Sequence, residues 1–105
     1  MPPWAVQTVD TGDCVLLRVS GELDVVTAPR MEPVLRSLHA RACELDLSQV
    51  PFIDSSGINL LIRHHRQADQ EGGSLRVIAA SRPVCRVLDI VGTSRLLGGP
   101  LPPRG

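Results

Sequence analysis

Residues 43–48, Cys-Glu-Leu-Asp-Leu-Ser, alternate apolar and polar side chains and lead through a short stretch into a helical pattern. Alternation with a period of two is typical of a β-strand that has one apolar face. The helical pattern consists of positions spaced three and four apart, which are Ile58, Leu61, Ile62 and His65. It ends near Gly72-Gly73, because glycine commonly stops a helix. A strand that runs into a helix in this way predicts an α/β fold.

The residues upstream predict a hairpin followed by a helix. Residues 4–10 and 14–20 are candidate strands, and the Thr11-Gly12-Asp13 stretch between them is typical of a tight turn. A helical pattern follows, with Thr27 as its expected N-cap. Its apolar positions are Met31, Val34, Leu35, Leu38 and Ala42. Pro33 lies inside this pattern, so we expect a kink or a late start of the helix.

The residues downstream predict one more strand and one more helix. Residues 75–79 alternate, and Ser81 then caps a pattern that Gly92 ends. Residues 94–97 can add a short edge strand, so the expected order is β-β-α-β-α-β-α with a possible final strand. Strands buried on both faces form nearly continuous apolar runs, whereas these strands alternate. We therefore expect the helices mainly on one face of the sheet.

Length and composition limit the classes of function. A chain of 105 residues predicts a single domain, with a core at about 4–97 and a flexible Gly/Pro tail at 98–105. The formal net charge is zero, so the basic surface typical of nucleic-acid binders is not expected. All eleven basic residues are arginine, which excludes lysine-dependent catalysis. We find neither a signal peptide nor an apolar run of the ~18 residues that a membrane span needs, and we expect a cytoplasmic location.

The stretch Asp54-Ser55-Ser56-Gly57 lies between the expected strand and helix. A phosphate on Ser55 would lie at the helix N-terminus, which stabilises a negative group by ~0.3–1 kcal/mol. At an interface, however, burying an unpaired charge costs ~2–5 kcal/mol. The local chemistry therefore suits a modification that the fold tolerates and that a partner does not. On these four residues alone, a simple helix-capping role is the alternative interpretation.

Four longer runs contain or flank this stretch. In chain order they are GELDVVTAP, ELDLSQVP, FIDSSGINLL and EGGSLRVIAASRPVCRVLDIVG, and the match extends over about residues 14–97. In this order they resemble the STAS family of sulphate transporter and anti-sigma factor antagonist domains, and most of all the bacterial antagonists of the sporulation stage II AA type. The resemblance implies a small mixed sheet of four to five strands with helices packed mainly on one face. The family often has a further C-terminal helix, where this chain has its Gly/Pro tail.

The resemblance also implies roles for individual residues. Ser55 matches the serine that accepts phosphate, and Ser56 matches its neighbour, which makes local hydrogen bonds. Positions at the partner-binding surface are matched by Asp54 and Gly57 of the D-S-S-G stretch, and by Asp24 of the G-E-L-D turn.

The implied function is that of an anti-sigma factor antagonist without enzymatic activity. When unphosphorylated, the chain would bind an anti-sigma factor serine kinase of the histidine-kinase-like ATPase type and release the sigma factor. Phosphorylation of Ser55 would end this interaction, and a serine phosphatase would reverse it. The kinase would supply ATP and Mg²⁺, so the chain itself needs no cofactor. The alternative is a constitutive STAS scaffold or transport-accessory domain that binds its partner without phosphoswitching.

The histidines and cysteines do not predict a metal site or a catalytic centre. Adjacent helix residues point about 100° apart, so His64 and His65 are not expected to share a ligand. We expect His65 to be partly buried and His64 to lie on the surface. The cysteines are far apart in apolar sequence, which is typical of buried small hydrophobes: Cys14, Cys43 and Cys85.

Overall fold

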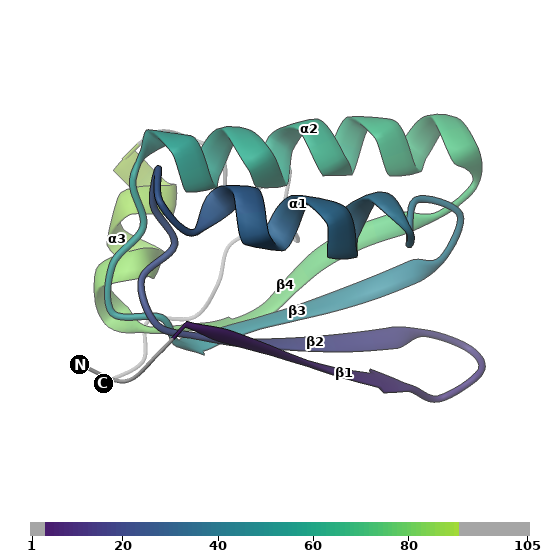
Figure 1. Ribbon diagram of the computed structural model, residues 1–105, viewed down its shortest axis with the longest axis horizontal. Helices are drawn as coiled ribbons and strands as arrows, with labels where there is room; N and C mark the ends of the chain where they lie inside the picture. Colours follow the sequence, from purple (N-terminus) through teal and green to yellow (C-terminus); the bar gives the residue numbers. More distant parts are fainter. Residues whose placement is uncertain (1–3, 91–105) are drawn as a thin grey trace.

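The computed structural model describes residues 4–90, which form four strands and three helices in the predicted order (Figure 1). The strands are β1 (Ala5–Asp10), β2 (Val15–Ser20), β3 (Ala42–Gln49) and β4 (Ser74–Ala80). The helices are α1 (Ala28–Arg36), α2 (Ser55–Glu71) and α3 (Arg82–Ile90). The predicted edge strand at 94–97 and the tail at 98–105 lie outside the described residues.

The strands form one mixed sheet in the order β1-β2-β3-β4, which confirms the predicted fold class. β1 and β2 pair antiparallel as a hairpin, whereas β2, β3 and β4 run parallel. Parallel neighbours need a crossover, and α1 and α2 provide the two crossovers. The carboxyl ends of β2, β3 and β4 therefore meet at one end of the sheet, where α2 begins.

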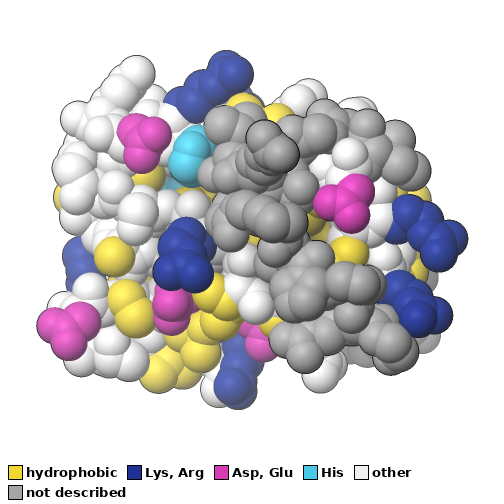
Figure 2. All heavy atoms as spheres, turned by 180° about the vertical axis from the view of Figure 1, so that it is seen from behind, with side chains coloured by type: hydrophobic (Ala, Val, Ile, Leu, Met, Phe, Trp, Pro, Cys, Tyr) yellow, Lys and Arg dark blue, Asp and Glu magenta, His cyan; other side chains and the backbone are white. Residues whose placement is uncertain are grey.

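The core lies between the sheet and its helices, and α1 and α2 lie on the same face (Figure 1). Alternate residues of the strands point into this core and are almost fully buried: Val15, Leu17, Val19, Cys43, Leu45, Leu47, Leu75 and Val77. The residues between them include Arg18 and Asp46, whose side chains approach to 3.8 Å on the other face. Figure 2 shows acidic and basic side chains interspersed over the far side of the molecule, as the zero net charge suggests.

Helix α1 begins earlier than its proline content suggested. Thr27 occupies the N-cap position, as predicted, but its side chain makes no capping hydrogen bond. The helix starts at Ala28 and continues through Pro33, so the expectation of a late start was wrong. Pro29 fits the first turn, where the missing N–H has no helical partner to lose. Met31 and Leu35 are fully buried and hold the helix on the core despite Pro33.

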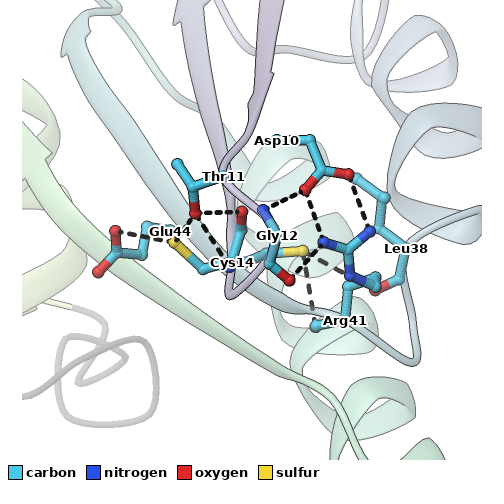
Figure 3. Close-up of polar contacts among 8 residues, drawn as sticks. Asp10, Thr11, Gly12, Cys14, Leu38, Arg41 and Glu44 are labelled. Atoms are coloured by element: carbon cyan, nitrogen blue, oxygen red, sulfur yellow. Dashed lines mark hydrogen bonds and ion pairs between the residues drawn. The ribbon is translucent and has the colours of Figure 1, made fainter.

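The opposite end of the sheet is fastened by an ion pair (Figure 3). Arg41, before β3, donates to both carboxylate oxygens of Asp10 at 2.7 and 3.0 Å. Asp10 also accepts from the Gly12 N–H at 2.9 Å. The Arg41 guanidinium and then the Gly12 N–H lower the pKa of Asp10 to about 2. This pair links the β1–β2 turn to the connection between α1 and β3.

The cysteine side chains differ in burial: Cys43 and Cys85 are buried, and Cys14 is half-buried. Burial raises the pKa of the Cys43 thiol.

None of the helices formed by residues 4–90 combines the length and apolar character that crossing a bilayer requires.

Candidate functional site

Two segments that are distant in sequence run side by side beyond the carboxyl ends of β2 and β3 (Figure 1). Leu23 and Ile53 form an isolated parallel bridge, and both side chains are buried. The Leu23 N–H donates to the Phe52 carbonyl at 2.9 Å, and the Asp54 N–H donates to the Leu23 carbonyl at 3.2 Å. This pairing brings the G-E-L-D turn against the D-S-S-G turn, so residues predicted from two separate motifs form one surface.

Asp54 is the N-cap of α2, and its carboxylate serves both segments. Oδ1 accepts from the N–H groups of Ser56 at 2.9 Å and Gly57 at 3.1 Å, which the helix itself leaves without partners. Oδ2 accepts from the Val25 N–H at 3.2 Å. Three backbone donors therefore fix the Asp54 side chain.

Asp24 uses its carboxylate within its own turn. Its Oδ1 accepts from the N–H groups of Val26 and Thr27, both at 3.0 Å. The Thr27 hydroxyl donates to the Glu22 carbonyl at 2.7 Å and accepts from the Asp24 N–H at 3.0 Å. These bonds close the turn in front of α1, and they explain why Thr27 does not cap that helix with its side chain.

Gly57 is buried directly beneath the paired segments. A Cβ atom at this position would lie 2.6 Å from the Leu23 carbonyl oxygen and 2.8 Å from Cγ1 of Ile53. Real Cβ atoms do not approach so closely, so only glycine lets α2 begin this near to the G-E-L-D turn. The structure thus gives Gly57 a packing role under the site.

Ser55 is the first residue of α2 and is exposed, whereas Ser56 is half-buried. Three exposed apolar side chains belong to the same paired segments: Val25 and Val26 at 66% and 69% exposed, and Phe52 at 48%. Beside them lies an open groove between α1 and α2, whose polar lining residues are Glu32, Ser56, Asn59, Arg63 and Arg66. The site therefore offers a hydroxyl beside an apolar surface and a groove that carries charges of both signs.

The exposed apolar residues of the site were not predicted. Two adjacent valines directly after Asp24, and a phenylalanine between Pro51 and a buried isoleucine, were the available signal. Their exposure depends on the pairing of the two segments, which sequence periodicity does not report. Within the described part of the chain, no three His, Cys, Asp or Glu side chains are grouped so that they could hold a metal ion.

The prediction that His64 lies on the surface was wrong. His64 is 3% exposed, and neither ring nitrogen has a hydrogen-bond partner among residues 4–90. Its ring centroid lies 4.7 Å from that of His39. Burial, together with the charges of His39 and His65, lowers the pKa of His64 to about 4. The buried face of α2 contains Leu60 and Leu61, which places His64 one turn later on the same face.

Comparisons with known proteins agree with this arrangement. A family profile described as the STAS domain matches residues 5–103. The anti-sigma-B factor antagonist of Staphylococcus epidermidis is 30% identical over 95 residues, which cover 88% of each chain. The crystal structure of an anti-sigma factor antagonist from Mycobacterium paratuberculosis superposes with a TM-score of 0.82 at 28% identity, over 97% of this chain and 87% of that one.

A more distant solved structure has the same fold. The Bacillus cell fate determinant SpoIIAA in its phosphorylated form gives a TM-score of 0.69 at 20% identity, over 88% of this chain and 87% of that chain. The mixed sheet with its helical layer and the paired turns thus define a small α/β domain of known architecture. The chain belongs to the STAS domain family.

Proposed function

We propose that this chain is an anti-sigma factor antagonist that binds an anti-sigma factor while Ser55 is unmodified and releases it when Ser55 is phosphorylated. The observation that carries the proposal is the exposed Ser55 hydroxyl beside the exposed valines of the G-E-L-D turn. The name of the Staphylococcus relative supports the regulatory class. The phosphorylated form solved for SpoIIAA supports a covalent switch.

In this proposal the chain is a substrate and not a catalyst. The partner is a serine kinase of the histidine-kinase-like ATPase type, which supplies ATP and Mg²⁺. The Ser55 Oγ forms a bond to the γ-phosphorus, the bond from that phosphorus to the β–γ bridging oxygen breaks, and ADP leaves. The hydroxyl proton passes to a base of the kinase. A serine phosphatase hydrolyses the phosphoserine and restores the binding form in the cytoplasm.

The direction of the switch follows from two opposed energies. The N-terminus of α2 stabilises a phosphate by ~0.3–1 kcal/mol, so the domain stays folded. An apolar partner surface that covers Val25 and Val26 would bury about −1.5 to −2 charge units without a counterion. That costs ~2–5 kcal/mol, and at ~1.4 kcal/mol per tenfold it weakens binding by tens to thousands of times.

The test is intact-mass analysis after incubation with such a kinase, ATP and Mg²⁺. Wild type should gain one phosphate, Ser55→Ala should gain none, and the matched control Ser56→Ala should still gain one. Modification that persists in Ser55→Ala would contradict the assignment. A kinase that bound the phosphorylated and unmodified chains with equal affinity would favour the constitutive scaffold instead.

A further inference from the structure

Asp54 links the helix that carries the candidate phosphoacceptor to the turn that carries the exposed valines. We propose that Asp54 is a positioning residue that holds the Val25–Val26 turn in place while Ser55 is unmodified, and that phosphorylation of Ser55 loosens this turn. The second half of the proposal rests on the proposed function of Ser55. The first half depends only on the geometry of the Asp54 carboxylate.

Through its side chain, Asp54 reaches the turn by one hydrogen bond, in addition to the backbone bonds of Leu23 to Phe52 and Asp54. Val26 and Thr27 donate their N–H groups to Asp24, inside the same turn. Val25 instead donates across to Asp54 Oδ2, 29 residues away. The Val25 N–H is therefore the point at which the Asp54 carboxylate fastens the part of the turn beyond Leu23 to the start of α2. Since the Val25 and Val26 side chains are 66% and 69% exposed, backbone bonds rather than packing determine where they point.

A phosphate on Ser55 would compete with the Asp54 carboxylate. Ser55 directly follows Asp54, and the first-turn N–H groups of Ser56 and Gly57 already donate to Asp54 Oδ1. A phosphate brings about −1.5 to −2 charge units and strong acceptor oxygens to the same turn. Two neighbouring anions then share one set of donors, and their repulsion favours rotation of Asp54 away from α2. That rotation also withdraws Oδ2 from Val25.

The consequence is that the modification would act on the binding surface in two ways. It would add a charge, and it would free the turn that presents Val25 and Val26. A partner would then have to order this turn again on binding, which adds an entropic cost to the electrostatic one.

The chain offers a matched pair of variants for the first half. Asp54→Asn keeps an oxygen for the helix cap, since asparagine and aspartate cap equally well, but it turns an NH₂ group toward the Val25 N–H. Asp24→Asn makes the same change of charge and shape in the neighbouring G-E-L-D turn. It keeps the side-chain oxygen that accepts from the Val26 N–H. Amide hydrogen exchange measured by NMR should be about tenfold faster at Val25 in Asp54→Asn. It should be unchanged at Val26 and throughout Asp24→Asn.

Wild-type exchange at Val25 in Asp54→Asn, or equal acceleration at Val26, would overturn the anchoring role. Thermal unfolding of both variants near the wild-type midpoint would show that the change is local.

The second half is tested with phosphoserine inserted at position 55 during translation, so that no kinase is needed. Exchange at Val25 should rise about tenfold, to the rate seen in Asp54→Asn, while exchange at Val26 stays unchanged. Unchanged exchange at Val25 would overturn the coupling and leave Ser55 as a phosphorylation site. If instead the kinase fails to modify wild type, the proposed function fails, while the exchange data on the inserted phosphoserine still decide the coupling.

Discussion

At the carboxyl ends of β2 and β3, backbone N–H groups donate to carbonyl oxygens and to the Asp54 and Asp24 carboxylates. At the opposite end of the sheet, side chains do most of the fastening. Arg41 approaches Asp10 to 2.7 Å, and His39 Nδ1 lies 3.3 Å from Glu71. The ring of His39 also packs against the buried His64.

The difference has a chemical consequence. Exposed ion pairs are screened by salt, whereas hydrogen bonds between backbone groups carry no net charge. The far end is therefore expected to depend more on salt than the backbone pairing at the candidate site. Variants at the two ends should fail in different ways.

The largest effect is expected at the glycines that let the chain pack closely at each end. Gly57→Ala places a methyl group against the Leu23 carbonyl oxygen, and the backbone must move. We expect the free energy of unfolding to fall by about 3 kcal/mol, as for an overpacked core. Urea denaturation followed by circular dichroism measures this loss.

Two other glycines provide the controls. Gly73→Ala meets the carbonyl oxygens of His39 and Arg41 at the far end, so it should lose a similar amount of stability without altering the Val25 amide. Gly72→Ala has open space and only a positive φ of 83°, so it should lose about 1 kcal/mol. Equal stability of Gly57→Ala and Gly72→Ala would refute the close packing at the site.

The next effect is acid sensitivity at His64. Its pKa is about 4 in the folded chain and about 6.5 when unfolded, so below about pH 6.5 the unfolded chain binds a proton that the folded chain does not. Stability should fall by about 2 kcal/mol from pH 7 to pH 5. His39 and His65 oppose protonation and Glu71 favours it. Urea titrations at the two pH values measure the change.

His64→Leu should remove this pH dependence and should be more stable than wild type at pH 7, because leucine leaves no unpaired polar atom in the core. His65→Leu is the matched control, since His65 is only half-buried, and it should retain the dependence. A wild-type pH profile in His64→Leu would assign the acid sensitivity to another group.

The smallest effect is expected at the exposed Asp10–Arg41 pair. Asp10→Asn should lower the midpoint of thermal unfolding by at most a few degrees, because exposed ion pairs contribute little. The pKa of Asp10 is lowered from 3.8 to about 2, so its contribution is present above pH 3.8 and is lost as the pH falls toward 2. Calorimetry measures the midpoint of thermal unfolding of the variant and the wild type. The difference between the two midpoints should become smaller as the pH falls from 3.8 toward 2, and also in high salt.

Features that follow from local sequence patterns could be predicted, whereas contacts between distant segments could not. Alternation in residues 43–48 predicted β3, and the glycine at position 72 predicted the end of α2. Both predictions rest on local patterns. The position of Asp54 at the helix start was also predictable as a cap. Its bond to Val25 was not, because that bond depends on the parallel bridge between Leu23 and Ile53.

The errors have similar causes. Periodicity over Ile58, Leu61 and Ile62 placed the apolar face of α2 too far toward His65, because that pattern did not include Leu60, which is buried as well. The structure centres that face on Leu61, His64 and Ala68 instead. Local propensity at Pro33 likewise predicted a kink or a late helix start, and the late start was wrong because burial of Met31 and Leu35 holds the helix on the core from Ala28 onward.

The bridge between Leu23 and Ile53 also determines at what stage of folding the surface around Ser55 and Val25 forms. Its two segments belong to different crossovers, and the bond from Val25 to Asp54 spans 29 residues of chain. Such non-local contacts form only after the loop between them has closed. A nascent or denatured chain carries the same serine without the neighbouring valines in register. A partner that contacts both segments would therefore bind only chains in which they have paired, and the proposed phosphorylation of Ser55 would be confined to folded molecules if the kinase contacts both.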